Sequence, residues 1–242
     1  MQLHDILFTQ GFGARRQCAA LVSQGRVSIG GRTCTDAQQE LAVEGLRFCV
    51  DGQAWDYQAR AYLMLNKPAG TECSHKPGIW VSVYSLLPVP LRQRPRKGAE
   101  AGVQAVGRLD QDTTGLLLFT DDGAFIHRMN SPRHHIPKVY EVSTAEPVDA
   151  AQVDRLLSGV VLHDSPEPVR AAACERTAER ALRLTLTQGK YHQVKRMVVA
   201  AGNQVVALHR CGIGGLLLPA DLAPGQWRWL DAAQVGQLQQ GA

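Results

Sequence analysis

Residues 107–123, GRLDQDTTGLLLFTDDG, constrain the fold more than any other part of the sequence. A polar loop carrying Asp110 leads directly into the apolar run 116–119. Because this run is apolar on both sides of its pleat, it predicts a central strand of a sheet that is covered on both faces. Asp110 would then be held at the end of a rigid element. The residue types alone equally allow Asp110 merely to cap its own turn with Thr113 and Thr114.

The composition limits the classes of protein to which the chain can belong. The chain has 242 residues and is 45% hydrophobic, enough for one large domain or for a large and a small one. No apolar run is long enough to cross a bilayer, and the N-terminus lacks the regions of a signal peptide, so we expect a cytoplasmic protein. Six cysteines stand far apart without a CxxC pair, which favours reduced thiols over a zinc site.

The positive charge is concentrated in parts of the chain. Residues 59–100 carry seven Lys and Arg against two Asp and Glu, whereas residues 1–58 carry five against six. Between Glu179 and Asp221 there is no acidic residue but there are six basic ones. Clustered cations of this kind are typical of proteins that bind a phosphate backbone. The alternative is a solvated surface on which charges cluster at random.

The first part of the chain predicts a small unit of two helices and a hairpin. Apolar residues recur at helical spacing over 3–9 and 14–24, and Gly25 stops the second helix. Residues 26–34, RVSIGGRTC, indicate two short strands joined by a glycine turn. Residues 52–60 are expected to join domains, which places one domain at 1–58 and the other at 59–242.

The rest of the chain predicts an α+β domain with a mixed, largely antiparallel central sheet flanked by helices. Residues 87–102, rich in Pro, Arg and Lys, are expected to form an exposed loop that meets RNA or stays mobile when free, and the alternative for each of its arginines is a merely disordered loop. Asp149 is expected to cap a helix, and Gly202 to end another one. The strands expected outside the 107–123 stretch are 62–65, 138–142, 160–163, 169–175, 182–187 and 204–210, and a further short helix is expected at 124–129.

The motifs, taken together, resemble those of a known family. GRLD, TTG and TDDG in the 107–123 stretch are similar to the catalytic motif of pseudouridine synthases of the RsuA type, which modify ribosomal RNA. The other matching blocks, in the family's order, are NKPAG (66–70), SPRHHIPKVYEV (131–142), GKYHQVKRM (189–197), LHRCGIGG (208–215) and DLAPG (221–225). Residues 11–31 resemble the core of an S4 RNA-binding domain, which precedes the catalytic domain in many members.

The resemblance implies which basic residues meet RNA. In the S4-like domain, Arg15 and Arg16 are expected to contact phosphates, joined by Arg26; the alternative is a module that serves only folding and docking. The remaining expected contacts are Arg92, Arg94, Arg96, Lys97, Arg133 and Arg196. His134 and His135 are adjacent and lack the spacing of two metal ligands, so no metal is expected there.

The resemblance also implies the chemistry. Pseudouridine formation breaks the bond from ribose to uracil N1, turns the base and joins ribose to C5. One positioned carboxylate can begin this reaction, so neither metal nor cofactor is needed. The resemblance identifies Asp110 as the catalytic aspartate, and Asp112 is expected only to shape the loop.

Three further residues are expected to support Asp110. Lys195 is similar to the salt-bridge partner of the catalytic aspartate, although by itself it is typical of an exposed helix lysine. Tyr140 matches the tyrosine that packs on the target uracil, and its alternative is cross-strand packing. Arg108 resembles the arginine that enters the RNA stack when the uridine leaves it.

These expectations combine into one function. The chain is expected to be an isomerase, most similar to the member acting on one uridine of 16S (small-subunit) ribosomal RNA. One alternative is a sibling acting on 23S RNA, and another is a non-catalytic ribosome-binding or assembly factor. We expect a monomer that acts on ribosomal RNA or on a small-subunit assembly intermediate.

Overall fold

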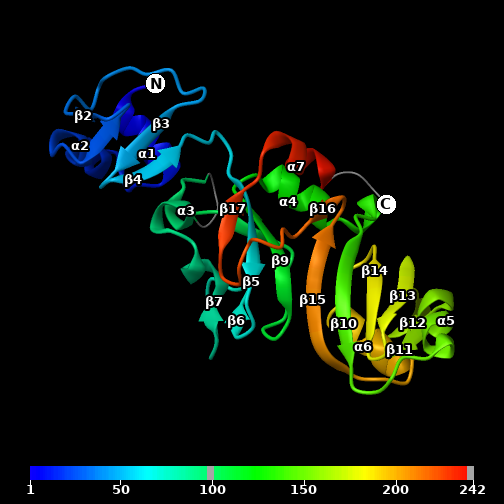
Figure 1. Ribbon diagram of the computed structural model, residues 1–242. Helices are drawn as coiled ribbons and strands as arrows, with labels where there is room; N and C mark the ends of the chain where they lie inside the picture. The colour runs from blue at the N-terminus through cyan, green and yellow to red at the C-terminus, as the bar shows by residue number, and fades with distance from the viewer. Residues whose placement is uncertain (97–100, 239–242) are drawn as a thin grey trace. The chain divides into compact units, whose positions relative to one another are not determined.

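The computed structural model describes residues 1–96 and 101–238 and separates the chain into two compact units (Figure 1). The first unit comprises Met1–Ala61, Leu87–Gln104 and Thr120–Asp122. The second unit comprises Tyr62–Leu86, Ala105–Phe119 and Gly123–Ala242. The expected domain boundary after residue 58 stays a prediction. In the structure, two later segments of the chain join the N-terminal residues in the first unit.

The first unit contains the two helices and the hairpin that the sequence predicts. Its helices share an apolar core with a four-stranded sheet of order β2-β1-β3-β4, in which β1 and β2 form an antiparallel hairpin. Phe12 packs edge-on against both Phe48 and Trp55 in this core. The elements are α1 (Leu3–Gln10), α2 (Arg15–Ser23), β1 (Val27–Ile29), β2 (Arg32–Cys34), β3 (Arg47–Val50) and β4 (Gln53–Asp56).

The segment at 87–102 differs from the expectation of an exposed loop, and that expectation is wrong for its described first half. Residues Val89–Gln93 form helix α3, and Leu87 and Leu91 are buried. Leu87 stands just before the helix and Leu91 lies within it, so apolar residues are buried among the prolines and arginines of this segment. The polar composition of the segment was therefore a poor guide to its burial.

The second unit is built on a mixed sheet, as expected, and the described residues contribute nine strands to it. The main strand order is β13-β14-β10-β15-β9-β5-β17, with β16 paired to β15 and β8 paired to β9. Strand β9 runs parallel to β15, whereas β10 pairs antiparallel with both of its neighbours. The strands are β5 (Tyr62–Lys67), β8 (Gln104–Val106), β9 (Thr114–Thr120), β10 (Lys138–Thr144), β13 (Ala173–Ala178), β14 (Ala181–Leu186), β15 (Val205–Ile213), β16 (Leu216–Leu217) and β17 (Trp227–Trp229).

The central position of β9 is confirmed. The strand lies between β15 and β5, and residues 116–119 are at most 1% exposed. Leu116 and Leu118 belong to a core cluster with Phe125 and Met129 of helix α4 (Gly123–Asn130). The loop that carries Asp110 thus continues directly into the best-buried strand of the sheet.

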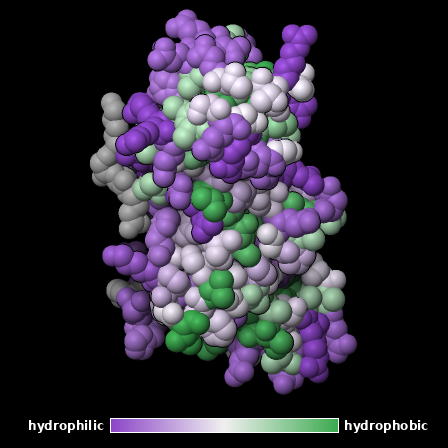
Figure 2. Space-filling model, turned by 90° about the vertical axis from the view of Figure 1, so that its left-hand side faces the viewer, coloured by the Kyte–Doolittle hydropathy of each residue, from purple (hydrophilic) through white to green (hydrophobic). Residues whose placement is uncertain are grey.

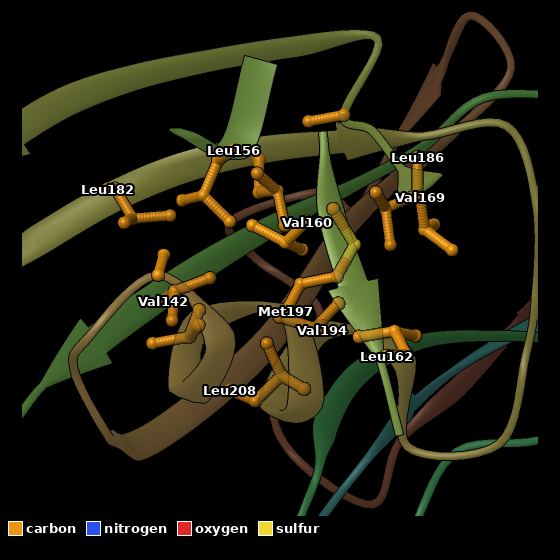
Figure 3. Packing of buried hydrophobic residues seen from close by; sticks show 14 of the residues in the cluster. Val142, Leu156, Val160, Leu162, Val169, Leu182, Leu186, Val194, Met197 and Leu208 are labelled. Carbon is orange, nitrogen blue, oxygen red and sulfur yellow. The ribbon is translucent and has the colours of Figure 1, made fainter. Parts of the chain in front are cut away.

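A second core cluster fixes helix α6 (Gln193–Ala200) against the sheet (Figure 3). Val194 and Met197 of this helix meet Leu156 of α5 (Ala150–Ser158), and strands contribute Leu182 and Leu208. Because α6 presents apolar residues to this cluster, its remaining face is free to carry polar residues.

Most other expected elements are confirmed, with one exception. Asp149 caps α5 by accepting a hydrogen bond of 2.6 Å from the Gln152 amide, and α6 ends two residues before Gly202. The expected strand at 169–175 is instead divided between β12 (Ser165–Val169) and β13. The two strands pair with different partners, β11 (Val160–Leu162) and β14, which a single sequence pattern does not reveal.

In the described part of the chain, the helices are too short or too polar to span a membrane.

Candidate active site

A cavity of about 1040 Å³ opens in the second unit beside the loop that carries Asp110. Its walls come from segments far apart in the sequence: the loop before β9, strand β10, the start of α6 and strand β15. Among the lining residues are Arg108, Asp110, Asp112, Tyr140 and Lys195. The structure therefore brings the catalytic candidate and its three expected supporting residues to one cavity.

A buried lysine fixes the backbone of the loop before β9 through hydrogen bonds. Lys67, at the end of β5, is fully buried, and its ammonium donates to the carbonyls of Pro68 (3.0 Å), Gln111 (3.3 Å) and Thr113 (2.9 Å). Gly70 adds a backbone hydrogen bond of 2.8 Å to the same Gln111 carbonyl. These contacts hold the backbone on both sides of Asp112, so the loop is placed by β5 as well as by β9.

Burial lowers the pKa of Lys67, against the opposing effect of the nearby Cys73, Asp112 and Asp110. NKPAG was expected only as a block shared with the family, and the buried position of Lys67 was not predicted. A lysine that ends an apolar strand just before a proline is the signal that would have found it, because such a side chain is either solvated or paired inside the protein.

The Lys195 ammonium contacts two carboxylates in the cavity. Lys195 Nζ lies 3.2 Å from Asp110 Oδ2, and it donates to Asp112 Oδ1 (2.7 Å) and Oδ2 (2.9 Å). The sequence-based expectation paired Lys195 with Asp110 and left Asp112 to shape the loop. The shorter contacts, however, are those with Asp112, so this carboxylate shares the lysine.

The pKa values of this pair follow from burial and from the pairing. Burial works against the charged form of Lys195, but the hydrogen bonds to Asp112 and Asp110 outweigh it and raise the pKa of the lysine. Burial is likewise the largest effect on Asp112 and opposes its ionisation, but the hydrogen bond from Lys195, the charge of Lys195 and smaller effects together outweigh it and lower the pKa of the aspartate. Both groups are thus stabilised in their charged forms.

His192 is a second neighbour of Asp110 that the sequence analysis missed. Its Nε2 lies 3.4 Å from Asp110 Oδ1, and its ring stacks on Tyr191 with centroids 3.8 Å apart. The residue begins α6 in a left-handed conformation (φ 48°, ψ 34°), which is unfavourable for a side chain with a Cβ. The available signal was its place in the YHQVKRM block, three residues before Lys195.

The glycine of the TTG motif allows β9 to approach β15. Gly115 has φ +104°, and a Cβ at this position would lie only 2.3 Å from the Arg210 carbonyl oxygen. The two residues are register partners in the parallel pair of strands. A side chain at residue 115 would push the strands apart next to the catalytic loop.

Arg210 brings a buried cation to the cavity. It is 3% exposed, its Nε donates to the Leu116 carbonyl (2.8 Å), and its Nη2 has no hydrogen-bond partner among the described residues. Lys138 also lines the cavity, and burial, together with the charge of Arg210, lowers its pKa. From the sequence, Arg210 was expected only as one of the six basic residues between Glu179 and Asp221.

Tyr140 occupies a position consistent with both of its expected interpretations. It is half-buried on β10 between Leu184 and Arg210 in the strand register, and it packs at the edge of the α6 core cluster. The same side chain lines the cavity. Arg108 lies at the cavity as well, but its side chain is exposed to solvent.

The basic residues expected to contact RNA fall into three groups. The first contains arginines that form ion pairs at the surface: Arg15 with Asp5 (2.7 Å), Arg26 with Asp51 (2.6 Å) and Arg196 with Asp164. The second contains the exposed Arg16, Arg92 and Arg133 and the half-buried Arg96. Lys97 lies outside the described residues.

Arg94 forms the third group and is a correction. It was expected in an exposed loop facing RNA, but it is 3% exposed. Its guanidinium donates to Asp121 Oδ2 (2.7 Å), Gln10 Oε1 (2.9 Å) and the Gln58 carbonyl (2.7 Å). Because these donors are already engaged inside the first unit, Arg94 is a structural residue and does not meet phosphate.

The first unit combines two helices with a small sheet, and the second unit holds a carboxylate beside a cation at its mixed sheet. Comparison with known proteins defines the class. Residues 61–200 match the family model for RNA pseudouridylate synthase, and residues 1–45 match the S4 domain. The chain therefore belongs to the RNA pseudouridylate synthase family and is an isomerase that carries an N-terminal S4 domain.

Individual relatives match over nearly their whole length. The chain is 36% identical over 236 residues to ribosomal small subunit pseudouridine synthase A of Pasteurella multocida, covering 97% of this chain and 98% of the relative. It is 39% identical to the protein of the same name from Escherichia coli K12, with the same coverage. A crystal structure of a pseudouridylate synthase, 32% identical, superposes with a TM-score of 0.67 over 98% of this chain and 99% of that chain.

Proposed function

We propose that this enzyme converts one uridine of 16S (small-subunit) ribosomal RNA to pseudouridine, with Asp110 as the catalytic carboxylate. The observation that carries the substrate is the match, along nearly the full chain, to relatives named for the small ribosomal subunit. The observation that carries the residue is the placement of Asp110 in a large cavity, within 3.4 Å of two basic side chains.

The proposed roles follow from the geometry. Asp110 begins the reaction either by attacking the base or by acting at the ribose, and the firmly held loop keeps it in place. Lys195 and His192 lie 3.2 and 3.4 Å from its carboxylate oxygens and help to orient it. Tyr140 stacks on the extruded uracil, and Arg108, exposed at the cavity, fills the space that the uridine leaves in the RNA.

We further infer that the enzyme acts as a monomer in the cytoplasm, on free ribosomal RNA or on an assembly intermediate of the small subunit. The Lys138 and Arg210 cations in the cavity support binding of the polyanionic substrate. A solution mass near the 26.4 kDa of one chain would support the monomer, and a doubled mass would contradict it.

A pseudouridine map tests the proposal. Ribosomal RNA from cells that lack the protein is compared with RNA from cells that receive the wild type, Asp110→Asn or Asp112→Asn. We expect cells that lack the protein to lose pseudouridine at one small-subunit site. The wild type should restore this pseudouridine, and Asp112→Asn should restore it to a measurable degree. Asp110→Asn should not restore it.

Other outcomes of the map contradict the proposal in distinguishable ways. A lost site in 23S RNA would make the enzyme a large-subunit sibling. No change at any site would favour a ribosome-binding or assembly factor. Full activity of Asp110→Asn would remove the catalytic assignment while leaving the substrate in place.

A further inference from the structure

A short loop beside the cavity exposes three large apolar side chains in succession. Ile79, Trp80 and Val81 are 91%, 42% and 60% exposed, and Trp80 also lines the cavity that holds Asp110. Figure 2 faces the side on which β6 and β7 lie in Figure 1, and hydrophobic residues show there as separate green patches among hydrophilic ones. Adjacent exposed apolar residues at the rim of a cavity indicate a contact surface.

This loop is braced by its own hydrogen bonds. It connects β6 (Thr71–Glu72) to β7 (Val81–Ser82), two strands that pair in parallel. The Gly78 amide donates to Glu72 Oε2 (3.0 Å), and Ser82 Oγ donates to the Ser74 carbonyl (2.6 Å). A braced loop loses little conformational entropy when a ligand binds, so Trp80 is presented in advance of binding.

The loop is also tied to the segment that leads to Asp110. His75 of the loop stacks on Tyr84 with centroids 3.7 Å apart, and Tyr84 is only 8% exposed. The Ala105 amide donates to the Tyr84 hydroxyl (3.0 Å), and Ala105 belongs to β8, which runs into the catalytic loop. The loop that presents Trp80 is therefore linked to the strand that leads to Asp110.

We propose that Trp80, flanked by Ile79, is a stacking platform for an unpaired nucleobase of the RNA next to the target uridine. This inference rests on the proposed function and specifies its substrate as RNA whose nucleotides beside the target are unpaired. Every base has a face that can stack on an indole ring, which explains an aromatic residue at the rim. Trp80 was not among the residues that were expected to contact RNA.

The charges around Trp80 favour RNA over an apolar protein partner. The loop itself exposes Lys76, and the cavity that Trp80 lines has, among the described residues, five cationic side chains against three carboxylates. The cations are Arg108, Lys138, Lys190, Lys195 and Arg210, and the carboxylates are Glu72, Asp110 and Asp112. The Glu72 carboxylate at the end of β6 accepts a backbone hydrogen bond from Gly78. An apolar ring among cations suits a nucleotide, whose base is flat and apolar on its faces and whose phosphate is anionic.

Binding of a small-subunit ribosomal RNA transcript tests the platform. Trp80→Ala is expected to raise the Kd for this transcript about 5- to 100-fold, the range for loss of one stacked base. Trp80→Phe should recover most of the affinity because it restores an aromatic face. The matched control is Val206→Ala, which removes a 71% exposed apolar side chain of β15 that does not line the cavity, and it should bind like wild type.

Two further measurements separate stacking from a structural effect. The fluorescence of Trp80, taken as wild type minus Trp80→Phe, should be quenched by the transcript and not by a fully paired RNA duplex of the same length. In modification assays, Trp80→Ala should raise KM more than it lowers kcat.

Equal Kd values for Trp80→Ala, Val206→Ala and wild type would overturn the inference, and so would an unquenched Trp80. The proposed function fails separately, if the wild type forms no pseudouridine in the same transcript.

Discussion

At the scale of single residues, the sharing of Lys195 by two aspartates decides how the site responds to pH. The ammonium contacts Asp112 at 2.7 Å and Asp110 at 3.2 Å, so it cannot be assigned to either carboxylate alone. The pKa of Lys195 is raised from 10.5 and that of Asp112 is lowered from 3.8. Both shifts favour the charged pair across the neutral range.

Replacement of Lys195 by Met is expected to lower the free energy of unfolding by about 1 kcal/mol or less, because the pair is partly exposed and screened by solvent. The contribution of Lys195 is complete below its unfolded pKa and is lost as pH rises through its raised folded pKa. The contribution of Asp112 is complete above its unfolded pKa and is lost as pH falls through its lowered folded pKa. The difference between variant and wild type should therefore stay constant from about pH 5 to 9 and shrink only outside that window.

Denaturant unfolding of both proteins over a series of pH values checks this expectation. Lys190→Met serves as the control, since Lys190 lines the same cavity but forms no part of the pair. A stability difference that changes steeply near pH 7 would contradict the assignment of the pair.

At the scale of elements, the position of the catalytic loop depends on contacts with strands on both of its sides. Lys67 fastens the loop to β5, and Gly115 lets β9 lie close against β15. Helix α6 supplies Lys195 at its first turns and is itself held by the apolar cluster of Figure 3. Strands β5 and β9 and helix α6 thus together position Asp110.

Replacement of Lys67 by Met is expected to lower the free energy of unfolding by about 2 kcal/mol, because three buried carbonyls lose a charged donor. Modification activity should fall further than stability alone explains, because the loop that holds Asp110 loses its anchor. Thermal unfolding and single-turnover assays below the unfolding temperature measure the two effects. Lys76→Met, on an exposed loop, should leave stability nearly unchanged, and equal behaviour of the two variants would contradict the anchoring role.

At the scale of the whole molecule, the first unit is not confined to the N-terminal residues. Arg94 and Asp121 lie far beyond the S4 match, which covers residues 1–45, yet both belong to the first unit. Their buried ion pair joins Gln10 and the Gln58 carbonyl in one network. The first unit is therefore built from one segment that precedes β5 in the chain and from two segments that follow it.

Replacement of Arg94 by Met is expected to cost about 3–5 kcal/mol of stability, because it leaves the Asp121 carboxylate buried without its partner. Calorimetry should show a lower melting temperature for the variant. Arg92→Met is the matched control, since Arg92 is on the same helix and exposed, and it should melt like wild type. A melting temperature of Arg94→Met equal to that of the control would show that the network contributes no stability.

Local patterns in the sequence were sufficient for much of the fold. The alternation and length of apolar runs predicted β9, the two N-terminal helices, the hairpin and the cap at Asp149, because each of these depends on residues that are close in the chain. The ordered motifs identified the family and pointed to Asp110, Tyr140 and Lys195. Short-range physics and the motif order therefore determined the class of protein and the candidate residues.

Only the tertiary structure decided which of those residues meet. Lys195 and Asp112 are 83 residues apart, Lys67 and Gln111 are 44 apart, and Arg94 and Asp121 are 27 apart. Whether a charged side chain is solvated or buried against such a distant partner depends on the register of the sheet and on the packing of helices over it, and no local pattern contains that information. For this reason the sequence predicted the lysine at the site but not its second carboxylate, and predicted an exposed arginine where the fold buries one.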